Sequence, residues 1–158
     1  MITRILSNLD RQLRAVTLLR QLQEEEFSHL ASRDAGGVSS VEFSIQELLR
    51  QLAMERHSLH RLYAAVDPKA KRLFDIIDRF APEAAEQARQ LHKAIDVGEQ
   101  RCAKLASRNY TMALGLYDVA KSGLDSLRAL LVPKKGIYGA KGRMAVATNS
   151  PGILRGRL

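Results

Sequence analysis

The amino-acid sequence predicts an all-α protein. We expect an elongated antiparallel helical bundle or coiled coil of three to four helices, with one very long C-terminal helix and a flexible tail. Leu, Ala and Arg are the most frequent of the 158 residues, and all three are good helix formers. Apolar residues recur at steps of three and four. The four prolines, at positions 68, 82, 133 and 151, interrupt none of these periodic segments.

The first helix is expected over residues 2–31. Its apolar stripe consists of Ile2, Leu6, Leu9, Leu13, Val16, Leu19, Leu22, Phe27 and Leu30. Gly36 and Gly37 are expected to form a tight reversal, because glycine adopts positive φ without steric cost. A short loop before a second helix of similar length predicts an antiparallel hairpin.

The second helix is expected over residues 39–65. Ser39 and Glu42 have the spacing of a capping box, and Val38 and Phe43 that of a hydrophobic staple. A third helix is expected over residues 68–80, with Asp67 as N-cap and an apolar side made of Leu73, Phe74, Ile76, Ile77 and Phe80. The residue before Pro82 disfavours helical geometry, so a break or kink is expected at position 81.

The last helix, over residues 82–131, has the most regular pattern. Its seam alternates steps of four and three through Ala84, Ala88, Leu91, Ile95, Gly98, Cys102, Leu105, Asn109, Met112, Leu116, Val119, Gly123, Ser126 and Leu130. Fifty residues make a helix of roughly 75 Å, whereas the first two reach only about 45 and 39 Å. The first two helices are therefore too short to cover the whole seam.

Apolar surface without an internal partner usually marks an interaction site. The candidate protein-binding residues are Leu105, Asn109, Met112, Leu116, Val119, Leu124, Leu127 and Leu130. Two alternatives are a second copy covering this surface, or the first two helices sliding along to cover it. Asn109 could fix the register of packing or hydrogen-bond the backbone of a bound peptide.

Charge divides the chain into a helical domain, residues 1–132, and a basic Gly-rich tail, residues 133–158. The tail holds six cations and no acidic residue, whereas the net charge of the whole chain is +8, so the helical domain carries only +2. A Gly-rich tail with one aromatic residue is poorly able to fold alone and suits transient docking. Tyr138 would anchor it, and cations such as Lys141 and Arg143 would steer it toward an acidic surface.

No pattern in the sequence indicates catalysis, a metal or a cofactor. Glu26 and His29 have the spacing of one di-iron ligand pair, but the second pair is missing, and His57 and His60 lack a third ligand. The sole cysteine, Cys102, cannot form an intramolecular disulfide. No stretch of 18 apolar residues occurs and the start is not that of a signal peptide. We expect a cytoplasmic protein that is not an enzyme and does not insert stably into membranes.

Two stretches, "LLRQLQEEEFSHLASRD" and "IQELLRQLAMERHSL", resemble the N-terminal helical hairpin of the FlgN family of flagellar export chaperones. The matching features are Glu25, Glu26, Asp34, Leu48, Leu49, Glu55 and Arg56. "RNYTMALGLYDVAKSGLDSLRALL" looks like the family's Asn-bearing last helix, and Tyr138 and Gly142 match its tail.

The resemblance implies a chaperone for hook–filament junction proteins of the FlgK and FlgL types. It would keep their helix-forming termini unassembled and deliver them to the flagellar export gate or the ATPase complex, with the tail as docking element. An amphipathic client helix would lie against the unpaired seam.

Two other functions remain open on the sequence alone. A helical nucleic-acid-binding protein could use the tail as a basic C-terminal arm. The nearly neutral helical domain, the single tail aromatic and the lack of a recognised motif argue against nucleic acid. A structural coiled-coil protein could self-assemble through the long helix.

Overall fold

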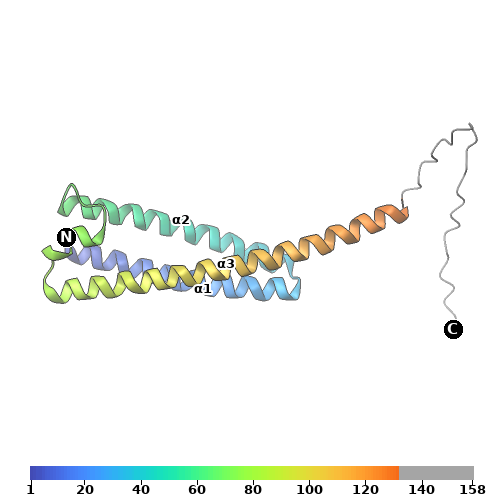
Figure 1. Cartoon of the computed structure of the whole chain (residues 1–158), viewed down its shortest axis with the longest axis horizontal. Helices are drawn as coiled ribbons and strands as arrows, with labels where there is room; N and C mark the ends of the chain where they lie inside the picture. Colours follow the sequence, from blue (N-terminus) through green and yellow to red (C-terminus); the bar gives the residue numbers. More distant parts are fainter. Residues whose placement is uncertain (132–158) are drawn as a thin grey trace, which may run out of the picture. The chain divides into compact units, whose positions relative to one another are not determined.

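The computed structural model describes residues 1–131, and every regular element in that range is helical (Figure 1). The elements are α1 (Ile2–Ser32), α2 (Ala35–Val66), the 3-10 turns η1 (Leu73–Asp75) and η2 (Ile77–Arg79), and α3 (Pro82–Leu131). The all-α prediction with a very long last helix is confirmed. Residues Met1–Leu116 form one compact unit, and a second unit begins at Tyr117.

The turn between α1 and α2 differs from the predicted one. Arg33 takes the left-handed conformation, with φ 58°, and Asp34 caps α2 by accepting a hydrogen bond of 3.0 Å from the amide of Gly37. The predicted capping box at Ser39 and Glu42 is wrong, because Ser39 already lies inside the helix and its hydroxyl donates to the carbonyl of Ala35. The carboxylate of Asp34 thus starts α2 four residues earlier than expected.

Gly36 and Gly37 lie in the first turn of α2 rather than in a reversal. A Cβ on Gly37 would stand 2.1 Å from Nδ1 of His29, which is closer than any real contact. That His29 nitrogen is 2.9 Å from the Asp34 carboxylate. Glycine at position 37 therefore serves the close approach of the two helix ends, not a positive φ.

Asp34 gives the turn a defined pH dependence. Hydrogen bonding, chiefly from the amide of Gly37, holds the pKa of Asp34 below its ordinary value of 3.8. A carboxyl with a lowered folded-state pKa stabilises the fold above its unfolded pKa, and the contribution is lost as the pH falls through the folded value. Asp34→Ala should therefore lower the melting temperature at pH 7, and the gap from the parent protein should close below pH 3.8.

Thermal denaturation followed by circular dichroism between pH 2.5 and 7 would check this, at intervals of about half a pH unit. Asp34→Asn is the matched control, because an amide oxygen still caps the helix without titrating. A gap between the parent protein and Asp34→Ala that widens in acid would contradict the assigned role.

The segment before α3 forms two 3-10 turns, so the α-helix predicted over residues 68–80 is wrong. The carboxylate of Asp75 accepts hydrogen bonds from the amides of Lys71 and Arg72, each 2.9 Å long, which competes with regular helix formation. The segment folds over the end of the bundle at which the chain begins (Figure 1). Its buried side chains join the main core: Leu73, Ile76, Ile77 and Phe80.

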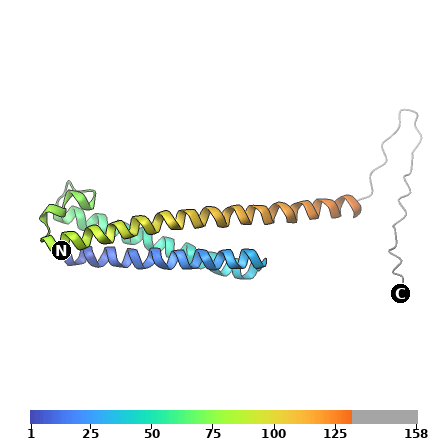
Figure 2. The same ribbon diagram turned by 60° about the horizontal axis from the view of Figure 1, so that its bottom comes forward.

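The predicted break before Pro82 is confirmed, because α3 begins at that residue. Among the seam residues, four are buried at intervals of seven: Ala88, Ile95, Cys102 and Asn109. Figure 2 shows this part of α3 running beside α1. The Cys102 thiol donates to the carbonyl of Val16 at 3.6 Å, and a Cβ on Gly98 would lie only 2.6 Å from Cγ1 of Val16. The small seam residues thus allow α1 and α3 to approach closely.

Candidate protein-binding surface

The α3 end segment, residues 117–131, is exposed at every position. This holds although the segment is rich in large apolar side chains. Six of them are between 54% and 82% exposed: Tyr117, Val119, Leu124, Leu127, Leu130 and Leu131. Monomeric proteins rarely leave so many neighbouring apolar side chains in water unless a partner covers them.

The structure divides the eight candidate residues into two groups. Val119, Leu124, Leu127 and Leu130 lie in the α3 end segment and are exposed. Leu105, Met112 and Leu116 are half-buried in the first unit, and Asn109 is fully buried there. The tail candidates Tyr138, Lys141, Gly142 and Arg143 lie outside the described residues.

Asn109 binds α1 of its own chain. Its side-chain amide donates to the carbonyl of Gln23 at 2.6 Å and to the carboxylate of Glu26 at 2.8 Å. Arg108 beside it stacks over the ring of Phe27, with 3.7 Å between the guanidinium carbon and the ring centroid. The contacts favour the first interpretation of Asn109, that it fixes the register of α3 on α1, and they remove its amide from any exposed surface.

Asn109→Ala should therefore weaken the fold. Loss of one buried and one partly buried hydrogen bond is expected to lower the free energy of unfolding by about 1–2 kcal/mol, because the Gln23 carbonyl and the Glu26 carboxylate each lose a donor. Urea denaturation would measure this. The exposed Ser107→Ala two residues away is the control, and equal stability of the two variants would contradict the role in register.

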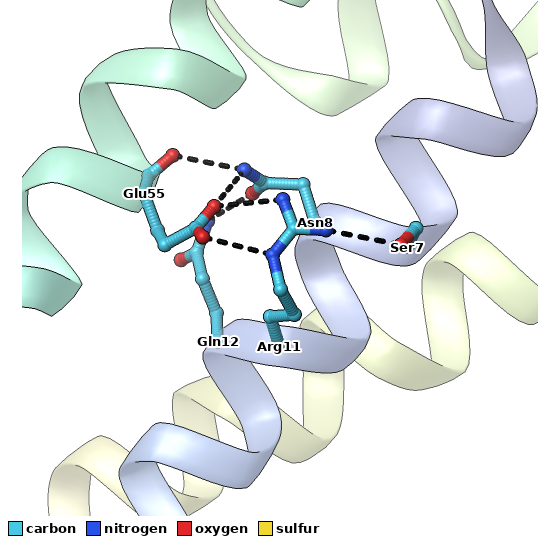
Figure 3. Close-up of polar contacts among 5 residues, drawn as sticks. All are labelled: Ser7, Asn8, Arg11, Gln12 and Glu55. Carbon is cyan, nitrogen blue, oxygen red and sulfur yellow. Dashed lines mark hydrogen bonds and ion pairs between the residues drawn. The ribbon is translucent and has the colours of Figure 1, made fainter.

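A polar cluster that the sequence analysis missed joins α1 to α2 (Figure 3). Asn8 is fully buried and donates to the carbonyl of Glu55 at 3.1 Å and to its carboxylate at 2.5 Å. Arg11 donates to the same carboxylate through Nε at 2.8 Å and through Nη2 at 2.9 Å. These hydrogen bonds hold the pKa of Glu55 below its usual range. Gln12 donates to the Asn8 oxygen at 2.7 Å, and Arg11 also donates to Ser7.

Glu55 and Arg56 thus fasten α2 to both of the other helices. The Glu55 carboxylate holds Asn8 and Arg11 of α1, and Arg56 forms an ion pair with Glu99 of α3. These contacts give both side chains a structural role in the bundle.

The described residues 1–131 contain no group of three or more His, Cys, Asp or Glu side chains that could hold a metal ion. Burial raises the pKa of the Cys102 thiol, so it stays protonated at neutral pH. No helix within residues 1–131 is both long and apolar enough to cross a bilayer.

The fold and its exposed apolar helix segment are typical of helical proteins that bind other proteins. The sequence model of the FlgN protein family matches residues 1–145. The chain therefore belongs to the FlgN family, as its two helical stretches indicated, and is in general terms a flagellar export chaperone that binds flagellar proteins. No curated protein and no solved structure is similar enough to the chain to count as a match.

Proposed function

We propose that this chaperone binds the terminal helical segments of hook-associated proteins of the FlgK and FlgL types. Binding takes place in the cytoplasm, blocks premature assembly and precedes delivery to the export gate. The observation that supports this is the exposure of the α3 end segment, where Leu127 and Leu130 have no partner among the described residues that would shield them from water.

One side of the segment suits a second helix. Val119, Gly123, Leu127 and Leu130 follow one another at steps of four, four and three, which places them on one face. Among residues 1–131, no atom outside the helix's own neighbouring backbone lies within 4 Å of a Cβ built on Gly123, so a partner backbone has room to approach there. Covering each leucine would contribute about 1.5–3 kcal/mol.

Charge contributes little to this surface. The segment holds two acidic residues, Asp118 and Asp125, and two cations, Lys121 and Arg128. Because hydrophobic burial rather than ion pairing would drive the complex, salt should weaken it only slightly. A nucleic-acid complex would instead lose affinity steeply as salt rises.

Isothermal titration calorimetry of the full chain with synthetic terminal peptides of FlgK- and FlgL-type proteins tests the proposal. Binding that persists at roughly 0.5 M salt supports it. Lack of binding to both peptides, together with a salt-sensitive shift of duplex DNA or RNA, would replace the chaperone proposal by the nucleic-acid one. Concentration-dependent oligomers in light scattering, without any client, would favour self-assembly.

The tail is proposed to dock on the export gate or the ATPase complex through Tyr138 and Gly142, aided by Lys141 and Arg143. Deleting residues 133–158 should leave peptide affinity within about twofold of the parent protein, because the tail is outside the client surface. The same deletion should abolish secretion of hook-associated proteins in a complementation assay. Normal secretion without the tail, or loss of peptide binding, would contradict the division of roles.

A further inference from the structure

An apolar depression lies in the first unit, between α1 and α3. It is an open groove of about 520 Å³ lined only by residues of α1 and α3. Leu13 and Val16 of α1 and Val97 of α3 line it with apolar surface. Val97 is 40% exposed, so the groove has apolar surface that this chain leaves partly in water.

The groove is strongly basic. Arg20, Lys93 and Arg101 are among its lining residues, and no Asp or Glu is. Within residues 1–131, Arg20 has one weak ion pair, 3.8 Å to Glu24, and Lys93 and Arg101 have none. The exposed Lys104 continues the row of cations along α3 at helical spacing.

The cations and the apolar surface of the groove together indicate which kind of partner would bind there. We propose that the groove docks an amphipathic helix of a partner protein in which acidic residues flank the apolar stripe. Leucines of such a helix would cover Leu13 and Val97, and its carboxylates would meet the cations at the rim. The α3 side of the groove spans Gln90 to Arg101, about three helical turns, so a helix of similar length fits.

Other occupants match less well. The tail of this chain has six cations and no acid, so it would repel Arg101 and its neighbours. A second copy would present an equally basic groove. A nucleic acid would satisfy the cations but leave the apolar floor uncovered. The groove contains no residue of the α3 end segment, so it is a separate site from the proposed client surface.

The test uses the full chain and a designed helical peptide of roughly 18 residues, with Leu at i, i+4, i+7 and i+11 and Glu on both flanks. Fluorescence anisotropy should show binding of this Glu peptide. A peptide with Lys in place of Glu, and one with Ser in place of Leu, should each bind at least about tenfold more weakly. Amide signals of Val97 and Gly98 should shift in NMR spectra during titration with the Glu peptide.

Arg101→Glu and Lys93→Glu should each weaken binding of the Glu peptide about tenfold. Both side chains are exposed, so their replacement leaves the core intact. Arg61→Glu on α2 makes the same charge change away from the groove and should have no effect. Equal binding of the Glu and Lys peptides, or insensitivity to both groove variants, would overturn the proposal. Much tighter binding by a chain ending at Leu131 would also overturn it, because the tail would then be the occupant.

Discussion

Leu127→Asp is expected to abolish binding of a FlgK- or FlgL-type terminal helix while leaving the fold intact. Leu127 is 54% exposed and lies outside the main core, so the fold does not depend on it. A client helix over this face would have to bury the new carboxylate without a partner, which costs several kcal/mol. We expect affinity in calorimetry to fall by about 100-fold or more. Circular dichroism and the melting temperature should remain those of the parent protein.

The matched control is Ser122→Asp, which adds the same charge to the same segment. Five positions before Leu127, Ser122 lies on a different side of the helix, so it should change affinity by less than about threefold. Leu116→Asp would be less informative, because Leu116 is half-buried in the first unit and the change would also disturb packing there. Equal loss from Leu127→Asp and Ser122→Asp would refute a face-specific contact.

Asn8→Asp should be the most destabilising near-isosteric change in the bundle. It replaces the buried donor that contacts both the carbonyl and the carboxylate of Glu55 by an acceptor. In the part of the chain that the structure describes, Arg11 is the single cation bound to that carboxylate, so two acids would compete for it. We expect the free energy of unfolding to fall by about 2–4 kcal/mol at pH 7, measured by urea denaturation.

The pH dependence of this variant has a definite sign. Burial beside a like charge raises the folded-state pKa of the new carboxyl above its unfolded value. The loss of stability is therefore greatest at neutral pH and shrinks as the pH falls through that raised pKa. Adding Glu55→Gln should restore part of the stability, because the amide can donate to the new acid. Failure of this second change to rescue, with no recovery in acid, would refute the cluster's role.

Helical periodicity predicted α1 almost to the residue and, together with Pro82 at its start, also predicted α3. It placed Ala88, Ile95 and Cys102 on the seam of α3, and these residues are buried. The predicted start of α2 and the predicted helix before α3 were wrong, because in both places two local structures compete. Asp34 and Ser39 are both good N-caps, and only the geometry of the hairpin decides between them. Residues 73–80 are apolar enough for a helix, but hydrogen bonds to Asp75 favour two tight turns instead.

The exposure of the α3 end segment could be predicted from the sequence, because the periodic pattern of α3 is much longer than those of the two helices before it. The polar cluster was missed because the leucines of α1 dominated its pattern. Steps of four and three from Ile5 pass through Leu9, Gln12, Val16 and Leu19 and would have placed Gln12 in the core. Its hydrogen bond to Asn8 depends on where α2 lies, which no pattern within α1 reveals.

The burial of Cys102 has a practical consequence for spectroscopy. This side chain is the chain's only cysteine, it is 4% exposed, and burial raises the pKa of its thiol. It should react slowly with maleimide dyes at neutral pH, because the thiolate is the reactive form. A cysteine introduced at Ser122 would then carry the fluorophore alone. Client capture and release could be timed by energy transfer without first removing the native thiol.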